Sequence, residues 1–247
     1  MSGTNKIPFF GVDRQYSSLR EEILDTIDTV YGSGQVLDGV HTKTFEKTIA
    51  KMTERNYACS VGSCTQALIF ALRAVNNEYF REQRNKILIP AQSFVATLNS
   101  VLEAGFDPVF CDVDAQTGLI DINKIPVEAN EIAAVMYVNL FGNCIDWDRF
   151  RIQTEFFNDD LVIIEDAAQS FGASYKGIPS GKLGDISVLS FDPTKNFHRI
   201  LFKPGAAVQA RELTQSQSIL QNQISNFADH IFSQNTPVSG GKVTTNL

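Results

Sequence analysis

The spacing of hydrophobic residues along the chain predicts helices that alternate with strands. Leu19, Ile23, Ile27 and Val30 recur at intervals of three and four, which predicts an amphipathic helix that ends at Gly32. We expect its apolar stripe to pack in the core. The same periodicity predicts further helices at residues 41–52, 65–75 and 91–104.

Short apolar runs between these helices predict buried strands. The run 161–164 is continuous and rich in β-branched residues, as is typical of a strand covered on both faces of a parallel sheet. The predicted strands lie at residues 56–61, 86–90, 107–114, 132–138, 161–166 and 186–191. Their alternation with helices predicts an α/β fold with a mostly parallel central sheet flanked by helices.

Composition indicates an ordinary globular protein. With 247 residues, 43% of them hydrophobic, the chain is long enough for one large domain with a substantial core. A net charge of −7 argues against a protein that coats nucleic acid. Because no apolar run has the length of a membrane span and the first residues lack a signal-peptide pattern, we expect a cytoplasmic protein without a membrane partner.

The four cysteines do not form a recognisable metal or disulfide pattern. Cys59, Cys64, Cys111 and Cys144 contain no CxxC pair, and no histidine lies at ligand spacing from them. We therefore expect no metal site, and interpret most of these cysteines as small buried hydrophobes.

An acidic residue and a lysine follow two neighbouring predicted strands. Asp166 ends the strand that begins at Leu161, and Lys195 follows the strand 186–191. A carboxylate and an amine at the ligand-binding edge of a parallel sheet suit pyridoxal phosphate, because the carboxylate can keep the pyridine nitrogen protonated while the lysine forms a Schiff base with the aldehyde. The alternative is that Asp166 is a helix N-cap and Lys195 a surface lysine.

The turn from Gly62 to Thr65 precedes a predicted helix. Backbone N–H groups and the positive end of the helix dipole favour a phosphate at such a position. Ser63 or Thr65 is equally consistent with an ordinary N-cap. The nearby GSGQVLDG run lacks the spacing of a dinucleotide fingerprint and follows no predicted strand, which argues against a dehydrogenase-like domain.

The runs EDAAQS at 165–170 and SFDPTKN at 190–196 resemble the DegT-like sugar aminotransferases, a family within the fold type I pyridoxal-phosphate enzymes. The resemblance implies a three-layer large domain of the PLP-transferase type. It also implies that Asp166 pairs with the pyridine nitrogen, that Gln169 lies against the cofactor, that Ser190 contacts its phosphate, and that Lys195 is the catalytic residue that carries the cofactor.

The same resemblance assigns roles elsewhere in the chain. The G-S-x-T-x-A-L motif implies that Cys64 and Thr65 hold the phosphate, with cysteine replacing the family's usual small residue. The run at 90–97 implies that Phe94, by default a core aromatic, stacks on the pyridine ring. Asn246 matches an asparagine that reaches the phosphate in a partner subunit, which implies a homodimer.

The resemblance covers nearly the whole chain and leads us to expect one domain over residues 1–247. Within it, residues 1–34 form an N-terminal helix and loop, residues 211–247 form a polar C-terminal segment, and the family's small C-terminal domain is absent. The sequence departs from the family pattern after the lysine, where Phe202, Lys203 and Pro204 replace most of a glycine-rich turn.

The implied activity is amine transfer, dependent on pyridoxal 5'-phosphate, from an amino acid such as glutamate to a keto sugar attached to a nucleotide. Histidine replaces the lysine in the family's dehydratases, so Lys195 favours transamination. The alternative is a catalytically inactive or truncated relative that keeps the fold and serves as a partner or structural subunit.

Overall fold

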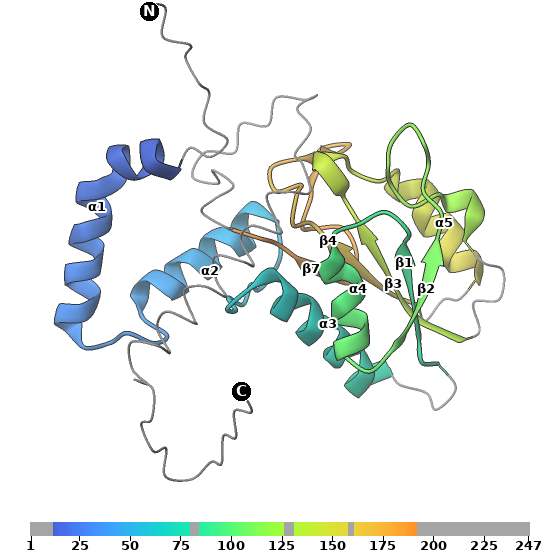
Figure 1. Ribbon diagram of the computed structural model, residues 1–247, viewed down its shortest axis with the longest axis horizontal. Helices are drawn as coiled ribbons and strands as arrows, with labels where there is room; N and C mark the ends of the chain where they lie inside the picture. Colours follow the sequence, from blue (N-terminus) through green and yellow to red (C-terminus); the bar gives the residue numbers. More distant parts are fainter. Residues whose placement is uncertain (1–11, 80–83, 126–130, 158–160, 192–247) are drawn as a thin grey trace, which may run out of the picture. The chain divides into compact units, whose positions relative to one another are not determined.

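The computed structural model describes residues 12–79, 84–125, 131–157 and 161–191 (Figure 1). The chain divides into two units, Met1–Ala207 and Val208–Leu247. All described residues belong to the first unit.

A five-stranded parallel sheet forms the centre of this unit. Its strands lie in the order β2-β1-β3-β4-β7, and every neighbouring pair is parallel. The strands are β1 (Lys86–Pro90), β2 (Asp107–Cys111), β3 (Ile132–Val138), β4 (Val162–Asp166) and β7 (Ile186–Val188). A two-stranded hairpin, β5 (Ser174–Tyr175) with β6 (Ile178–Pro179), lies between β4 and β7 in the chain.

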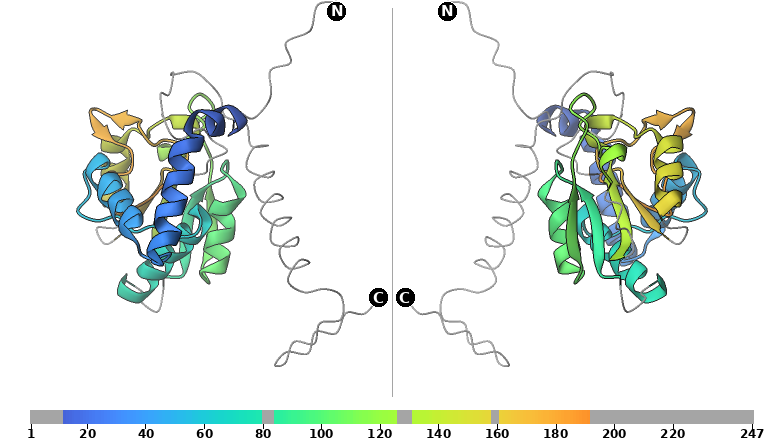
Figure 2. Two further views of the ribbon diagram at one scale, coloured as in Figure 1. Left: turned by 90° about the vertical axis from the view of Figure 1, so that its left-hand side faces the viewer. Right: turned by 90° about the vertical axis from the view of Figure 1, so that its right-hand side faces the viewer.

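Helices cover both faces of the sheet, as the continuous apolar runs predicted. All seven residues of β3 are buried. On one face Leu88, Val135 and Ile163 belong to a core cluster that includes Phe150 of α5 (Trp147–Phe157). Alternate strand residues face a second cluster that includes residues of α3 (Cys64–Tyr79) and α4 (Val95–Glu103). The right-hand view of Figure 2 shows α4 and α5 on opposite sides of the sheet. The predicted three-layer α/β class is confirmed.

The remaining elements are two N-terminal helices, α1 (Val12–Ser33) and α2 (Val40–Met52), and two short 3-10 helices, η1 (Ile122–Lys124) and η3 (Leu140–Gly142). The predicted helix positions are confirmed to within a few residues. The predicted core packing of the α1 stripe is wrong. No residue of α1 is buried, and Ile27 is 44% exposed.

The predicted strand at residues 56–61 is also wrong. This segment has no regular secondary structure and pairs with no strand among the described residues. Tyr57 is 89% exposed and Val61 39% exposed, so its apolar side chains have no sheet to cover. A strand forms only where a neighbour satisfies its backbone groups, and hydrophobic alternation cannot supply that neighbour.

Gly184 allows the loop before β7 to lie against β4. Its φ is +78°, and a Cβ there would lie 2.9 Å from the Ile163 carbonyl oxygen. Gly177, in the β5–β6 turn, has a similar φ of +86° but open space around it. We expect Gly177→Ala to lower the free energy of unfolding by about 1 kcal/mol through backbone strain alone, and Gly184→Ala by about 3 kcal/mol because overlap adds to that strain. Urea unfolding measures both losses, and equal losses would contradict the close approach.

The cysteines differ in burial. Cys59 is exposed and Cys111 is buried. Burial, with nearby Asp121 and Asp112, raises the pKa of Cys111 to about 11, and burial raises the pKa of Cys144 to about 11. Since the thiolate is the reactive form, we expect iodoacetamide at pH 8 to modify Cys59 in the folded chain and Cys111 and Cys144 only on unfolding. Peptide mapping by mass spectrometry checks this order. Rapid modification of folded Cys111 would contradict the packing at the end of β2.

Candidate functional site

The carboxyl ends of the parallel strands lie along one edge of the sheet. The chain runs from β1 to β2 on one side of β1 and later enters β3 on its other side, so the strand order reverses between β1 and β3. Ligands bind in such sheets outside the carboxyl ends near that reversal. The register places Val138 opposite Asp166, and Asp166 opposite Val188. The segments after β3, β4 and β7 therefore leave the sheet side by side.

Asp166 is the last residue of β4 and is only 4% exposed. One carboxylate oxygen accepts a hydrogen bond from the Ala168 N–H at 3.1 Å, and the other from the Thr97 hydroxyl at 3.3 Å. The Thr97 and Ser93 hydroxyls are 2.6 Å apart, and when Thr97 donates to Asp166 it is Ser93 that donates to Thr97. Thr97 of α4 and Ala168 of the turn after β4 thus orient a buried carboxylate at the ligand-binding edge.

The predicted N-cap alternative for Asp166 is partly correct. Its side chain does accept from the N–H two residues ahead, but the next segment is a turn rather than a helix. Aspartate commonly makes this local bond in turns. This bond occupies one carboxylate oxygen of Asp166, and the other oxygen accepts a hydrogen bond from Thr97.

Gln169 follows Asp166 in the same turn and is half-buried. Its side-chain oxygen accepts the backbone N–H of Phe141 at 2.9 Å. Phe141 has a φ of +58°, an uncommon conformation for a residue with a Cβ, and strain of this kind is often found at functional sites. Because the oxygen is engaged by Phe141, the amide nitrogen is the end of Gln169 that can donate to a ligand.

The predicted phosphate site lies at the start of α3. The Ser63 hydroxyl accepts from the Gln66 N–H at 3.2 Å, so the N-cap interpretation is correct for Ser63. Cys64 and Thr65 occupy the first turn of the helix and are half-buried. The positive end of the helix dipole therefore lies beside these two residues.

Phe94 and Ser190 lie at the same end of the sheet. Phe94 precedes α4, is half-buried, and packs against the core cluster that also contacts Cys64. Ser190 follows β7 by two residues and is half-buried. Lys195 and Asn246 lie outside the described residues, as do Phe202, Lys203 and Pro204. The structure thus brings the segments that carry the six described candidates to one edge of the sheet.

A buried network beside the site was missed at the level of sequence. Glu165 is fully buried and accepts hydrogen bonds from Asn139, Ser180, Gly181 and Ser187. Burial raises the pKa of Glu165, while these donors and the nearby Arg55 act to lower it. The acidic pair Glu165-Asp166 was visible in the sequence, and strand alternation places the two side chains on opposite faces of the sheet. Nothing in the sequence indicated the distant donors that surround Glu165.

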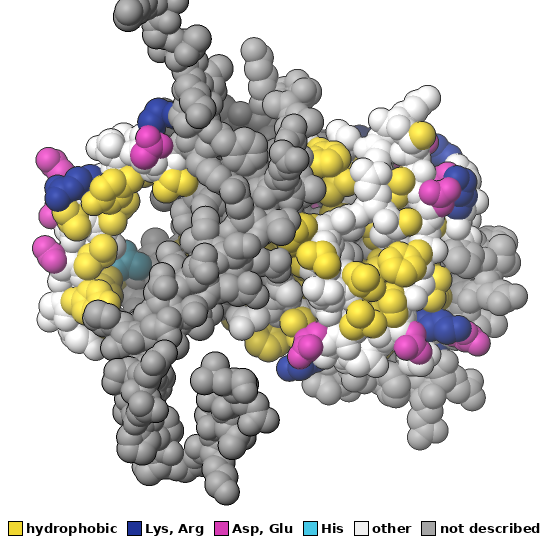
Figure 3. Space-filling model, viewed as in Figure 1, with side chains coloured by type: hydrophobic (Ala, Val, Ile, Leu, Met, Phe, Trp, Pro, Cys, Tyr) yellow, Lys and Arg dark blue, Asp and Glu magenta, His cyan; other side chains and the backbone are white. Residues whose placement is uncertain are grey.

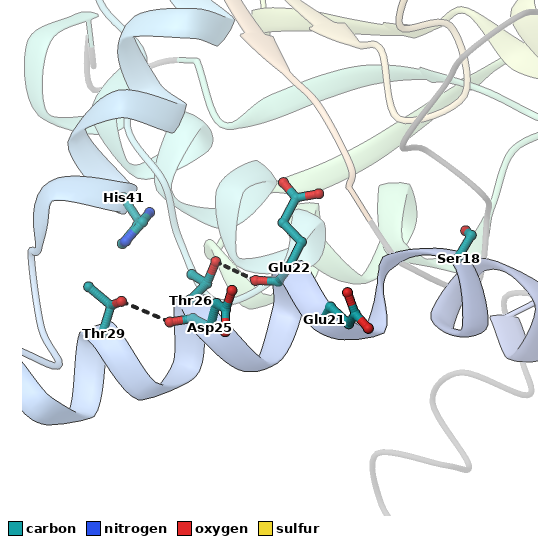
Figure 4. A pocket seen from close by; sticks show the side chains of 7 residues that line it. All are labelled: Ser18, Glu21, Glu22, Asp25, Thr26, Thr29 and His41. Atoms are coloured by element: carbon teal, nitrogen blue, oxygen red, sulfur yellow. Dashed lines mark hydrogen bonds between the residues drawn. The ribbon is translucent and has the colours of Figure 1, made fainter.

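The pocket shown in Figure 4 is formed by the two N-terminal helices. It is lined by Ser18, Glu21, Glu22, Asp25, Thr26 and Thr29 of α1 together with His41 of α2. The Thr26 and Thr29 hydroxyls donate to carbonyl groups one turn earlier in α1. Three carboxylates in the lining disfavour an anionic ligand, and none of the predicted site residues contributes.

Two further features of the described residues bear on the type of protein. No three His, Cys, Asp or Glu side chains among them gather in a way that could hold a metal ion. None of the helices in the described part of the chain combines the length and the hydropathy that a membrane span requires.

Comparisons with known proteins identify relatives over most of the chain. A 3-oxo-glucose-6-phosphate:glutamate aminotransferase of Bacillus subtilis (strain 168) is 32% identical over 195 residues, which cover 78% of this chain and 42% of that protein. GDP-perosamine synthase of Escherichia coli O157:H7 is 30% identical over 173 residues, 70% of this chain and 45% of that protein. The chain spans about half the length of the relatives it matches.

Solved structures agree with the fold. S. venezuelae DesV, solved in complex with a ketimine intermediate, matches with a TM-score of 0.69 and 29% identity over 77% of this chain and 50% of that one. Bacillus subtilis NtdA with bound cofactor PMP matches with a TM-score of 0.67 and 32% identity over 78% of this chain and 42% of that one. The model of the DegT/DnrJ/EryC1/StrS aminotransferase family matches residues 17–237. The chain belongs to the DegT/DnrJ/EryC1/StrS aminotransferase family.

Proposed function

We propose that this chain takes part in amine transfer dependent on pyridoxal 5'-phosphate, from an amino acid to a keto sugar attached to a nucleotide. The observation that carries the proposal is the buried carboxylate of Asp166, oriented by Thr97 and Ala168 at the ligand-binding edge of the sheet. In the net reaction the donor amino acid becomes a keto acid and the sugar ketone becomes an amine, so the cofactor is regenerated.

The described residues fit this cofactor by their chemistry. Asp166 would pair with the pyridine nitrogen, and the amide nitrogen of Gln169 would donate to an oxygen on the ring. Phe94 would cover one face of the ring and exclude water from it. The first turn of α3, with Cys64 and Thr65, together with Ser190 would hold the phosphate. Asn246, outside the described residues, would add a phosphate contact from a partner subunit.

Pyridoxal phosphate, when bound, supplies an aldehyde and an electron-accepting ring. Lys195 would hold the cofactor through that aldehyde and then move a proton to and from the substrate carbon as general base and acid. Asp166 would keep its negative charge facing the ring nitrogen throughout. Thr97 and Ala168 donate to its two oxygens and orient the carboxylate.

The substrate class rests on the relatives. Their names include a GDP-perosamine synthase, a UDP-2-acetamido-2-deoxy-3-oxo-D-glucuronate aminotransferase and a spore coat polysaccharide biosynthesis protein. One relative is named for glutamate as the amine donor. We therefore propose a nucleotide-linked keto sugar and glutamate for this chain, in the biosynthesis of a polysaccharide or a related sugar product. We place this activity in the cytoplasm.

A homodimer is the assembly we propose. None of the 22 residues of α1 is buried, although the helix carries an apolar stripe. Tyr31, near the end of α1, is 74% exposed, and Leu37, in the loop after α1, is 82% exposed. Figure 3 shows hydrophobic side chains on α1 and on the surface of the sheet domain. A second copy of the chain that covers this helix would remove the apolar surface from water.

Thiol protection tests the cofactor site without relying on activity. Cys64 lies in the proposed phosphate site, whereas Cys59 is exposed on the preceding loop and serves as the internal control. We expect pyridoxal phosphate to slow modification of Cys64 by about tenfold or more and to leave Cys59 unchanged, with pyridoxal lacking the phosphate giving less protection. Equal modification of Cys64 with and without the cofactor would overturn the assignment.

The same samples separate the catalytic proposal from its alternative. If Cys64 is protected and L-glutamate is converted to 2-oxoglutarate, the chain performs the donor half of the transfer. If Cys64 is protected but no conversion occurs in the dimer, the chain is the non-catalytic relative that retains the cofactor. Size-exclusion chromatography with light scattering provides the oligomeric state in which both measurements are made.

A further inference from the structure

Arg55 connects the end of α2 to the loop that precedes β7. Its Nε donates to the Gly181 carbonyl at 2.9 Å and its Nη1 to the Asp185 carbonyl at 3.1 Å. Its Nη2 donates to the carbonyls of Leu183 and Gly184, at 3.1 and 2.7 Å. One guanidinium therefore binds four carbonyl groups within five consecutive residues, more than 120 positions away in the chain.

Glu165 holds the same loop from the side of β4. One of its oxygens accepts from the Gly181 N–H, the Ser180 hydroxyl and the Asn139 amide, each at 2.9 Å. The other accepts from the Ser187 hydroxyl at 2.8 Å. Each of the four partners can donate to the carboxylate, and the Ser187 hydroxyl also lies 2.8 Å from the Leu183 carbonyl oxygen.

Ser187 joins the two charged residues. Its oxygen accepts from Arg55 at 2.8 Å while its hydroxyl reaches Glu165 at the same distance. Ser187 is also the residue of β7 that lies opposite Glu165 in the sheet register. We call Arg55, Asn139, Glu165, Ser180 and Ser187 the Arg55–Glu165 network.

Bonds at both ends of β7 also support its register: the Asp185 N–H donates to the Ile163 carbonyl at 2.7 Å, and the Ala167 N–H to the Val188 carbonyl at 2.8 Å. The Arg55–Glu165 network adds side-chain bonds to this support. The strand has three residues, and its only strand partner in the described part of the chain is β4. A slip by one residue would turn the Ser187 hydroxyl to the other face of the sheet and leave the buried Glu165 carboxylate without that donor. Because an unsatisfied buried charge is costly, the network penalises other registers more strongly than an apolar contact would.

We propose that Arg55 and Glu165 are positioning residues for the transfer reaction, which fix the register of β7 on β4 and thereby place Ser190 relative to Asp166. The proposal rests on the proposed function for its catalytic consequence. Ser190 lies two residues after β7, and the chain continues from it toward Lys195. A shift of one residue along a strand displaces the residues after that strand by about 3.3 Å. With such a shift, Ser190 could no longer contact the phosphate while Asp166 contacts the ring nitrogen of the same cofactor.

Hydrogen–deuterium exchange of the chain without cofactor tests the structural half. The variants are Arg55→Met and Ser187→Ala, with Arg55→Lys as a milder change that keeps the charge but loses the planar fork. Arg149→Met, on the exposed side of α5, is the matched control. We expect amides of residues 186–188 to exchange about tenfold faster in Arg55→Met while those of β3 keep their wild-type rates, with smaller changes in Arg55→Lys. Wild-type exchange in β7, or an equal increase in β3, would overturn the proposal.

Borohydride reduction in the presence of pyridoxal phosphate tests the catalytic half. We expect the share of label on Lys195 to fall in Arg55→Met and Ser187→Ala and to remain at the wild-type value in Arg149→Met. A share unchanged in all variants would overturn the positioning role. If the wild-type chain takes up no specific label while β7 exchange still responds to Arg55→Met, the proposed function is wrong. The role of Arg55 in fixing the register of β7 on β4 is then still supported.

Discussion

Lys195→Ala is expected to abolish amine transfer. In the proposed function the lysine supplies both the attachment of the cofactor and the proton transfer at the substrate carbon, and loss of a positioned acid and base alone lowers rates by about 10²–10⁴-fold. Conversion of L-glutamate to 2-oxoglutarate, measured in a single turnover with pyridoxal phosphate, is the readout. Binding of the cofactor should persist in part, because Asp166 and the first turn of α3 remain.

The matched control for this change is Lys176→Ala. Lys176 is exposed in the β5–β6 turn, where its ammonium pairs with Asp148 at 2.6 Å. Its removal should leave conversion of L-glutamate within about twofold of wild type, because an exposed ion pair contributes little to stability. Conversion by Lys195→Ala at a rate close to that of the control would show that another group moves the proton.

Asp166→Asn is expected to lower the same conversion by about 10²–10³-fold. The reason is electrostatic, since asparagine has nearly the shape of aspartate but carries no charge to keep the pyridine nitrogen protonated. Asparagine also makes the local side-chain to backbone bond as well as aspartate does. The substitution can preserve the bond to Ala168, but it removes the charge and replaces the oxygen that accepts from Thr97 by an amide that donates. Thr97→Val measures the loss of the Thr97 bond alone, which separates that loss from the loss of charge.

Thr97→Ser and Thr97→Val provide the control for Asp166. Serine keeps the hydroxyl that donates to Asp166, whereas valine has a similar shape without it. We expect Thr97→Ser to retain most of the activity and Thr97→Val to lose part of it, with less effect than Asp166→Asn. Activity of Asp166→Asn within a few fold of wild type would mean that the carboxylate serves the turn and not a cofactor.

The sheet was predictable because buried parallel strands have a clear pattern. The apolar runs of β1, β3 and β4 lie where the sequence predicts them, since each must be hydrophobic on both faces. The place of Asp166 at a strand end followed from the same pattern. The resemblance to the family implied that Gln169 lies against the cofactor, and the structure places Gln169 in the turn after Asp166.

Features that depend on distant partners were not predictable. The bonds of Arg55 span more than 120 positions in the chain, and no local pattern marks the four carbonyls it binds. The prediction of a strand at 56–61 was wrong for a related reason. A strand needs a neighbouring strand to pair with, and none of the described strands pairs with this segment. The sequence correctly predicted an apolar stripe on α1. The spacing of the apolar residues could not show whether this stripe packs against the same chain or against a second copy.

The measurement that tests the central claim most directly is the absorbance spectrum of the purified chain mixed with pyridoxal phosphate, before and after reduction with borohydride, followed by mass-spectrometric mapping of the modified peptide. We predict a visible band that disappears on reduction, with the cofactor attached at Lys195. No visible band, or label distributed over exposed lysines such as Lys43 and Lys176, would contradict a cofactor site between Asp166 and Lys195 in this chain.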